Sequence, residues 1–307
     1  MKKRILSLFC LLLCLPLCAG CADHGTVSSS PPPSSASPTP ALPKDPKAGR
    51  TLVWNDEFDG NTLDNQKWGT GFTMTTGGSQ KTDAKHIAVK DGNLVLTSTY
   101  TKLGGCQTPA ALLTQGKMSF TYGYVEMRAI LPFKHGAWPS FWMKSEIKDA
   151  KWMAEYDILE VFSDSRYMEF NLHKWSNSTG GDHTQLNPMP RGYTFPASAK
   201  PWEEYHLYAM EWTPDTISFL VDGVVKCKAV ISELSPYRSW GADVGLNGMD
   251  GFHDSAYLIL NNSVITDQNY ASWMKADWKA EKEDYPFTYQ VDYIRLYQKD
   301  GETLNVN

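Results

Sequence analysis

The sequence predicts an all-β fold, a sandwich of two antiparallel sheets in one large domain. Short runs of alternating or β-rich composition recur along the chain, at residues 93–98, 124–129, 205–212 and 216–221. Turn sequences separate such runs, namely Asp91-Gly92, Thr213-Pro214-Asp215 and Asp222-Gly223. Short strands joined by tight turns are typical of antiparallel sandwiches.

The length of the chain allows a single domain of this kind. Of its 307 residues, the first 49 lack the composition of a folded core. All-β domains reach the remaining size, about 250 residues, without splitting. The net charge is −5, and acidic and basic residues are interspersed. This distribution predicts binding neither to nucleic acid nor to a charged membrane face, and we expect a monomer.

The N-terminus has the pattern of an export signal. Residues 1–4 are basic, residues 5–17 are apolar but too short to span a bilayer, and small residues follow. The segment 17–21, LCAGC, resembles the processing box of bacterial lipoproteins, although Cys18 stands where an aliphatic residue is usual. We expect a signal peptide over residues 1–20 and a lipid on Cys21 that anchors the protein at the bacterial cell surface or outer membrane. The alternative is an ordinary secretory signal cut nearby.

The composition changes twice more along the chain. Residues 21–49 begin with Cys21 and are rich in Pro and Ser, so they predict a semi-rigid linker rather than a folded unit. We place the folded domain at residues 50–300 and a tail at 301–307. Only Cys106 and Cys227 fall within the domain. They either form a disulfide in an oxidising compartment or remain two buried free thiols.

Residues 152–162, WMAEYDILEVF, combine strand-like apolar composition with the acids Glu155, Asp157 and Glu160. Burying a charge without a partner is costly, so acids in such a strand indicate a function. Calcium-binding carboxylates usually come from loops with oxygen-rich neighbours, whereas the neighbours here are apolar and aromatic. The pattern favours catalysis over a calcium site or a solvent-facing strand.

Strand geometry adds a condition to this interpretation. Side chains alternate, so Glu155 and Asp157 share one face while Glu160 points to the other. A β-bulge at Ile158 or Leu159 would return Glu160 to the first face. Carboxyl groups close together resist joint ionisation, so one stays protonated as an acid while another is an ionised nucleophile. Retaining glycosidases need carboxyls about 5–5.5 Å apart and inverting ones about 6.5–9.5 Å, and sequence spacing does not decide between them.

The chain resembles glycoside hydrolase family 16 over residues 51–299. Its acidic motif, Glu-x-Asp-x-x-Glu, matches the bulged branch that includes laminarinases and marine galactanases. Other matching stretches follow in order: LVWNDEFDG at 52–60, YGYVEMRA at 122–129, WPSFWM at 138–143, EWTPD at 211–215 and VDYIRLYQ at 291–298. The resemblance implies a concanavalin A-like β-jelly-roll sandwich with a concave substrate cleft, and it makes residues 50–300 the catalytic domain.

The resemblance also implies roles for the acids and a double-displacement mechanism with retention of configuration. Glu155 would be the nucleophile, Glu160 the general acid/base, and Asp157 the residue that orients and tunes Glu155. No cofactor is needed for this catalysis. A structural calcium is a separate expectation from the resemblance. Its ligands would be Glu57, Gly92 and Asp292.

The resemblance further implies side chains that bind the sugar. The candidates are Trp138, Trp142, Trp175, His173, Arg128 and Asn261. Of the two tryptophans that flank Pro139, we expect Trp138 in the cleft and one of the pair in the core. His173 is expected beside Asp157 or Glu160. Arg128 would bind substrate or the catalytic acids, or else form a structural ion pair.

The implied substrate is a β-1,3- or mixed β-1,3/1,4-glucan, cleaved internally, because residues 138–143 look laminarinase-like. The run NSVIT after Asn261 departs from the usual glucanase pattern. A β-galactan backbone, as in agar, carrageenan or mucin glycans, is therefore the second interpretation. A surface carbohydrate-binding protein without catalysis and a transglycosylase are the others. The retained acids argue against the binding protein, and the sequence does not separate hydrolysis from transglycosylation.

Overall fold

A computed structural model describes residues 45–71, 81–82, 84–101, 105–146, 152–176, 182–187, 191–241, 251–266 and 278–307. The expected signal peptide, the expected lipidation site at Cys21 and most of the expected linker lie outside these residues. The described residues belong to one compact unit that begins at Pro43. Within them, no helix has the length and apolar character needed to cross a bilayer.

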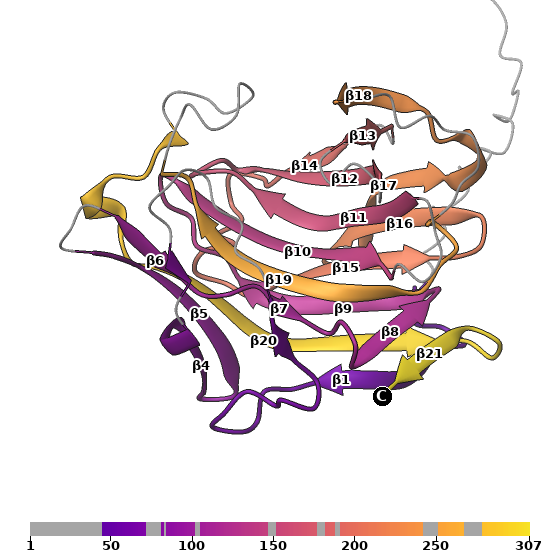
Figure 1. Cartoon of the computed structure of the whole chain (residues 1–307), viewed down its shortest axis with the longest axis horizontal. Helices are drawn as coiled ribbons and strands as arrows, with labels where there is room; N and C mark the ends of the chain where they lie inside the picture. Colours follow the sequence, from indigo (N-terminus) through magenta and orange to yellow (C-terminus); the bar gives the residue numbers. More distant parts are fainter. Residues whose placement is uncertain are drawn as a thin grey trace, which may run out of the picture. The chain divides into compact units, whose positions relative to one another are not determined.

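Two β-sheets make up this unit (Figure 1). The 10-stranded sheet consists of β1 (Thr51–Asp56), β3 (Lys81–Thr82), β4 (Ile87–Lys90), β5 (Asn93–Tyr100), β6 (Cys106–Thr108), β9 (Gly123–Ile130), β15 (His206–Trp212), β16 (Thr216–Val221), β17 (Val224–Val230) and β20 (Phe287–Gln298). The 11-stranded sheet consists of β2 (Gly69–Thr70), β7 (Leu112–Leu113), β8 (Met118–Thr121), β10 (Ala137–Ser145), β11 (Trp152–Val161), β12 (Tyr167–Ser176), β13 (His183–Leu186), β14 (Gly192–Thr194), β18 (Pro236–Trp240), β19 (Ala256–Val264) and β21 (Thr303–Val306). Short 3-10 helices lie at Ala84–His86, Ile231–Glu233 and Lys282–Asp284.

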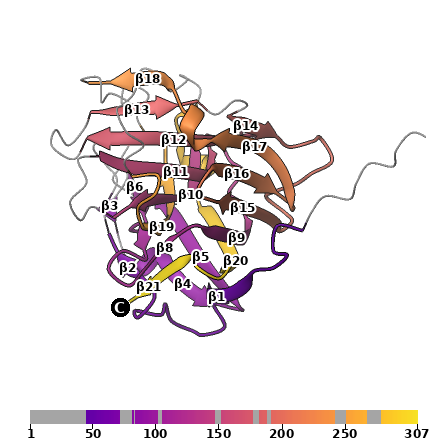
Figure 2. The same ribbon diagram turned by 90° about the vertical axis from the view of Figure 1, so that its right-hand side faces the viewer.

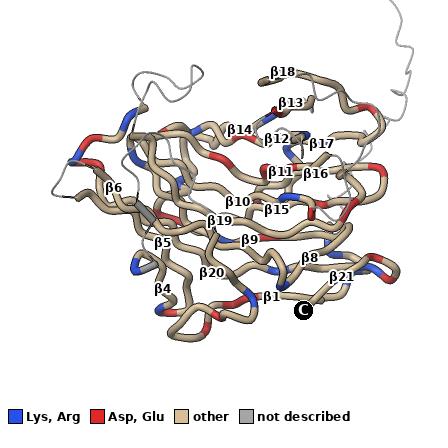
Figure 3. Tube along the Cα trace, in the orientation of Figure 1, with Lys and Arg blue, Asp and Glu red and all other residues tan. Residues whose placement is uncertain are grey.

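The strand pairing confirms the predicted antiparallel sandwich. The main order of the 10-stranded sheet is β17-β16-β15-β9-β20-β5-β6-β3, and that of the 11-stranded sheet is β18-β13-β12-β11-β10-β19-β7-β2. Among the described strands, only β3 and β6 pair in parallel. Figure 2 shows β11–β13 in one layer and β15–β17 in the other. Charged positions of both signs are spread along the strands (Figure 3).

The Asp-Gly turns form where the sequence predicts them. Asp91 and Gly92 have φ values of 53° and 71°, and they join β4 to β5; Asp222 and Gly223 have φ values of 51° and 74°, and they join β16 to β17. Two successive residues with positive φ are the requirement of the tight hairpin turn whose twist matches its strands. Asp tolerates this conformation better than most residues, and Gly adopts it freely.

The core lies between the two sheets. Phe170 of β12 stacks on Phe219 of β16 with ring centroids 5.1 Å apart, and Tyr156 of β11 contacts Trp212 of β15 at 5.1 Å. The central strands β10, β11, β12 and β19 of the 11-stranded sheet send alternate side chains into this core, apart from the irregularity in β11. The residues between them point to the opposite side of the sheet, where the predicted catalytic acids are found.

The C-terminal end of the predicted domain needs adjustment. The expected tail at 301–307 contains β21, which pairs with β8, so it is part of the sheet. The strand is only four residues long and its side chains are exposed or partly exposed, so its short alternation of Leu304 and Val306 with polar residues is a weak signal. At the N-terminal end, Arg50 is bound to Glu302 and to Glu211.

Cys106 and Cys227 are free, buried thiols.

Candidate active site

A β-bulge in β11 brings the three acids to one face. Opposite β12, Asp157 pairs with Asn171 and Glu160 with Glu169, so three steps along β11 match two steps along β12. Opposite β10, Phe141 pairs with Leu159 and Trp142 with Asp157, which leaves Ile158 as the extra residue. This confirms the predicted bulge.

The pairings define a catalytic face, the side of the 11-stranded sheet that carries Glu155, Asp157 and Glu160. Three cross-strand rows run over it. The first contains Lys144, Glu155, His173, Gln185 and Arg238; the second contains Trp142, Asp157 and Asn171; the third contains Asn261, Ser140, Glu160 and Glu169. Residues directly opposite each other lie about 4.5–5.5 Å apart at Cβ. The acids are therefore neighbours across and along the sheet.

Burial dominates the electrostatics of Glu155, which is 8% exposed. The pKa of Glu155 is raised to about 7; burial is the largest cause, the charge of Asp157 adds to it, and His173 and Lys144 oppose the rise. The cause is the cost of an ionised carboxylate in a poorly solvated place beside a like charge. Near neutral pH, Glu155 is thus close to the point where it ionises.

The protonated form of Glu160 is also favoured. Burial, followed by the charges of Asp157 and Glu169, raises the pKa of Glu160 well above its ordinary value. The Trp138 indole N–H donates to Oε1 of Glu160 at 3.1 Å, and the Asn171 amide donates to Oε2 at 3.2 Å. These two donors fix the orientation of the carboxyl group.

Asp157 of the second row contacts His173 of the first row. The Asp157 Oδ2 atom lies 3.3 Å from Nε2 of His173, and both side chains are almost fully buried. Burial lowers the pKa of His173, against the attraction of Glu155. Burial, and then the charge of Glu169, raises the pKa of Asp157 well above its ordinary value. Of the two partners expected for His173, the structure selects Asp157.

Comparison with known proteins agrees with this arrangement. The family model for glycosyl hydrolases family 16 matches residues 72–236, more than half of the chain. The chain belongs to glycoside hydrolase family 16. A glucan endo-1,3-beta-glucosidase A1 of Niallia circulans is 30% identical over 292 residues, covering 84% of this chain and 39% of that protein. A keratan-sulfate endo-1,4-beta-galactosidase of Sphingobacterium multivorum is 29% identical over 259 residues, covering 80% of this chain and 55% of that protein.

The solved structures support the same family. The laminarinase catalytic domain from Thermotoga maritima MSB8 superposes with a TM-score of 0.62 at 25% identity, covering 82% of this chain and 98% of that chain. The two relatives above are longer proteins, of which this chain spans 39% and 55%. The family 16 fold is thus shown over most of the chain.

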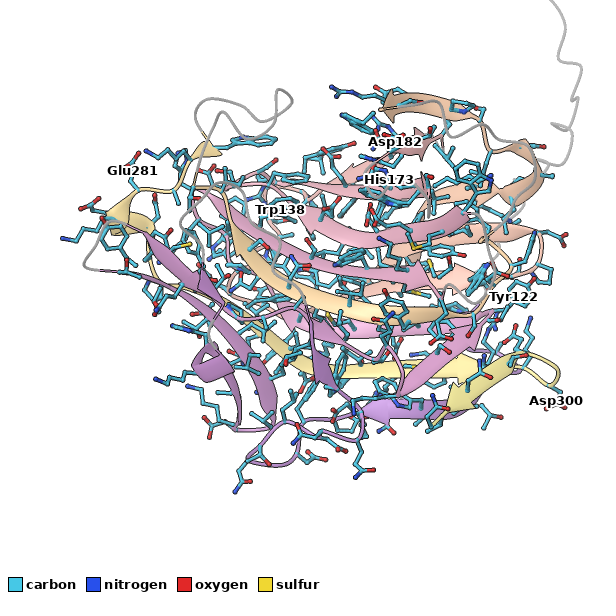
Figure 4. The ribbon with its side chains drawn as sticks, viewed as in Figure 1. Tyr122, Trp138, His173, Asp182, Glu281 and Asp300 are labelled. Atoms are coloured by element: carbon cyan, nitrogen blue, oxygen red, sulfur yellow. The ribbon has the colours of Figure 1, made fainter. Side chains whose placement is uncertain are left out.

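Both tryptophans of the WPSFW motif of this family 16 member lie on the catalytic face. Trp138 packs against Phe162 with ring centroids 5.3 Å apart, and Figure 4 shows it on the same side of the sheet as His173. Trp142 donates from its indole N–H to Oδ1 of Asn261 at 2.8 Å. The exposed fractions are 5% for Trp138 and 6% for Trp142. Neither ring lies between the two sheets, and Trp142 is buried in a separate apolar cluster with Leu113, Tyr257 and Ile259.

Some residues of the site escaped the sequence interpretation. Asn171, Gln185, Lys144 and Glu169 all face the acids. The Gln185 amide donates to Asn171, which completes a chain of donors that ends at Glu160. The sequence contained a signal for two of these residues. Asn171 precedes the predicted site residue His173 by two positions, and Lys144 follows the predicted site residue Trp142 by two. Because side chains alternate along a strand, each pair lies on one face.

Arg128 lies far from this family 16 site. It belongs to β9 in the 10-stranded sheet, where Val125, Met127 and Ala129 point into the core. Alternation sends Arg128 to the outer side of that sheet, where its guanidinium binds Asp292 and stacks on Tyr205 at 4.2 Å. The expectation that it binds substrate or the acids is wrong, and the structural ion pair is correct.

Two of the expected calcium ligands, Glu57 and Asp292, form ion pairs with arginines. Both carboxylate oxygens of Glu57 accept from Arg295, at 2.8 and 2.7 Å, and this bond lowers the pKa of Glu57. Asp292, at a register shift of β20, is bound to Arg128. Calcium takes six to eight oxygen ligands, whereas here two guanidinium groups engage the carboxylates. As these side chains lie, the set does not fit a calcium ion.

One group of described residues has the proximity of a metal site. Glu155, Asp157 and His173 offer ligand atoms within 4.8 Å of one another. A carboxylate-histidine set of this kind suits zinc better than calcium. The His173 nitrogen, however, already faces the Asp157 oxygen at 3.3 Å. We interpret the group as the hydrogen-bonded centre of the acids, and a double displacement needs no metal.

Proposed function

We propose that the protein is an endo-acting, retaining glycoside hydrolase that cleaves β-1,3- or mixed β-1,3/1,4-glucan. The observation that carries the proposal is the bulge at Ile158, because it places Glu160 on the same face as Glu155 and Asp157. Membership of family 16 and the kinship with a glucan endo-1,3-beta-glucosidase support the glucan. The roles of the two glutamates are those that the resemblance implies, and their surroundings support them.

In the first step, Glu160 donates its proton to the glycosidic oxygen while the Glu155 carboxylate attacks the anomeric carbon. The bond to the leaving sugar breaks, and a covalent glycosyl ester forms on Glu155. This division agrees with the pKa shifts, since Glu160 is raised well above its ordinary value and Glu155 to about 7. A carboxyl group whose protonated form is favoured by neighbouring negative charges is suited to act as the acid.

In the second step, Glu160 removes a proton from water, the resulting hydroxide attacks the anomeric carbon, and Glu155 leaves as a carboxylate. The charge of Glu155 is one cause of the raised pKa of Glu160. Esterification of Glu155 removes that charge, so the pKa of Glu160 falls when it must act as a base. The proximity of the two acids therefore serves both steps.

Asp157 holds the centre of this arrangement. It lies between the two glutamates along β11 and faces His173 at 3.3 Å. Its charge raises the pKa of both Glu155 and Glu160. Asp157 and His173 thus orient and tune the two glutamates. They do not themselves form or break a bond to the sugar.

An endo-β-galactanase acting on agar, carrageenan or mucin-type glycans is the second candidate. Kinship with the keratan-sulfate endo-1,4-beta-galactosidase favours it, as does the NSVIT run after Asn261. A non-catalytic surface carbohydrate-binding protein would not need three acids on one face, two of them buried, so we place that interpretation last. Transglycosylation uses the same intermediate, and analysis of the products separates it from hydrolysis.

For the location of the protein, we infer export and attachment to the bacterial cell surface or outer membrane through a lipid on Cys21. The LCAGC sequence at 17–21 supports this, and the Pro/Ser-rich linker would hold a monomeric catalytic domain away from the membrane. Metabolic labelling with a radioactive fatty acid tests the proposal. Wild type should be labelled and Cys21→Ala should not; an unlabelled wild type would contradict the lipid anchor.

The enzymatic proposal is tested by incubating the purified protein with laminarin, lichenan, agarose, carrageenan and mucin. Wild type is expected to cut laminarin or lichenan internally, with the anomeric configuration retained in the first product seen by NMR. Glu155→Gln and Glu160→Gln should lose this activity. Unchanged cleavage by either variant would overturn the catalytic assignment, and cleavage of galactans alone would establish the second candidate.

A further inference from the structure

A chain of hydrogen-bonded side chains crosses the catalytic face from β13 to the proposed acid. Gln185, Asn171 and Glu160 each belong to a different cross-strand row of this face. The Gln185 amide donates from Nε2 to Oδ1 of Asn171, and the Asn171 amide donates from Nδ2 to Oε2 of Glu160 at 3.2 Å. Gln185 is 8% exposed and Asn171 is 3% exposed. Water therefore has little access to either amide.

The Asn171 amide can meet Glu160 with either of its two ends. Its nitrogen only donates and its oxygen only accepts, and a half-turn about the last side-chain bond exchanges them. With the nitrogen at Oε2, as found, the proton of a protonated Glu160 stays available to a sugar. With the oxygen there, that proton would be donated to Asn171 instead. The bond from Gln185 selects the first arrangement, because Gln185 reaches the oxygen of Asn171 only when the nitrogen faces Glu160.

The other groups around Glu160 leave this role to the two amides. They are the Trp138 indole on β10, Asp157 and Glu155 on β11, and Glu169 on β12. The indole N–H donates to Oε1 at 3.1 Å, and the charges of the three acids oppose ionisation of Glu160. Among the described residues, the side-chain donor to Oε2 is Asn171. The hydrogen bond at Oε2 thus depends on which end of the Asn171 amide is presented.

We propose that Gln185 is a positioning residue for the general acid: by donating to Asn171, it keeps the Asn171 nitrogen facing Glu160 and the Glu160 proton available to the glycosidic oxygen. Gln185 acts through Asn171 and does not contact the reacting atoms. The same bond serves the second step, in which the Asn171 N–H stabilises the Glu160 carboxylate. The inference rests on the proposed hydrolase function, because it requires Glu160 to be the acid.

The test compares two leaving groups in Gln185→Met, which keeps the length of the side chain and removes the donor. Cleavage between two sugars needs the proton of Glu160, whereas 2,4-dinitrophenolate leaves a sugar without protonation. We expect kcat/KM to fall about tenfold to a hundredfold for oligosaccharides of the polymer that wild type cleaves. For a 2,4-dinitrophenyl β-glycoside of the same sugar, it should fall by less than about twofold. An unchanged ratio of the two values, whether both fall or neither does, would overturn the inference.

Two further variants check the route through Asn171. Asn171→Leu should show the same contrast between the leaving groups, and the double variant with Gln185→Met should lose no more than Asn171→Leu alone. Losses that multiply in the double variant would overturn the inference. Gln290→Met is the matched control, since Gln290 of β20 in the other sheet donates to the Tyr205 hydroxyl; it should leave both values of kcat/KM unchanged.

A second measurement needs no turnover. NMR titration of the side-chain carboxyl carbon of Glu160, assigned with Glu160→Gln, reports its ionisation directly. In Gln185→Met the pKa of Glu160 should rise by about one unit, because its carboxylate loses a fixed donor. An unchanged pKa would overturn the inference. A wild type that cleaves no polysaccharide would refute the proposed function, and the titration would still decide whether Gln185 keeps Asn171 a donor.

Discussion

Glu169 provides a sharp test of how the catalytic acids are tuned. It pairs directly with Glu160 across β11 and β12, and its charge is a cause of the raised pKa of Glu160, after burial and Asp157. Replacing it by Gln removes one negative charge and keeps the shape of the side chain. Ionised Glu160 then meets less repulsion, so its pKa falls and it loses its proton at a lower pH.

The size of this change follows from the separation. Opposed side chains bring the two carboxyl groups to about 6 Å, where like charges repel by about 2.8 kcal/mol at an effective dielectric constant of 20 and about 0.7 kcal/mol in water. Glu169 is partly exposed, which favours the middle of this range. Since one pKa unit corresponds to about 1.4 kcal/mol, we expect the pKa of Glu160 to fall by about one unit.

The assay is kcat/KM on laminarin as a function of pH. Activity rises as Glu155 ionises and falls as Glu160 loses its proton, so the two limbs report the two acids. Glu169→Gln should move the alkaline limb down by about one pH unit. The acid limb should stay near pH 7, because Glu169 is not among the causes of the shift at Glu155. Glu233→Gln, in an exposed 3-10 turn, is the control. An unmoved alkaline limb, or a displaced acid limb, would refute the reasoning.

Four further outcomes are expected. Glu160→Gln should lower kcat by about 10²–10⁴ without changing the urea midpoint; a smaller loss would remove it as the acid. Trp142→Phe leaves Oδ1 of Asn261 buried without its donor, so the free energy of unfolding in urea should fall by about 1–3 kcal/mol, and an unchanged value would contradict this bond. Arg128→Gln should leave kcat/KM unaltered, since Arg128 binds Asp292 on the other sheet; a loss of activity would return it to the site. Dialysis against EDTA should leave both kcat and Tm unchanged, and a drop in either would indicate a bound metal.

The sequence predicted the parts of the fold that depend on neighbouring residues. Asp-Gly turns require two positive φ values, and the alternation of side chains follows from strand geometry, so the hairpins at Asp91 and Asp222 were predictable. The bulge was predictable for a different reason. Without it, Glu160 would point into the inter-sheet core, where an unpaired carboxylate is costly. The apolar neighbours of the acid therefore indicated the irregularity.

Features that depend on pairing between distant strands were not predictable in the same way. Arg128 alternates correctly within β9, but which side of the sandwich it faces depends on the pairing of β9 with β15 and β20. The same limit applies to Gln185, which reaches Asn171 only through the register of β12 and β13. Residues 303–306 alternate polar and apolar side chains over only four positions, so their pairing with β8 is what identifies them as a strand.

The properties of the catalytic centre depend both on the sequence of β11 and on the strands that pair with it. Burial alone would raise the pKa of every acid in β11, and it would not distinguish a nucleophile from an acid. The distinction comes from the neighbouring strands: β10 supplies Lys144 beside Glu155, whereas β12 supplies Glu169 beside Glu160. A cation favours ionisation of the first glutamate and an anion opposes ionisation of the second. The bulge sets the faces, and the register of the flanking strands supports the proposed division of roles.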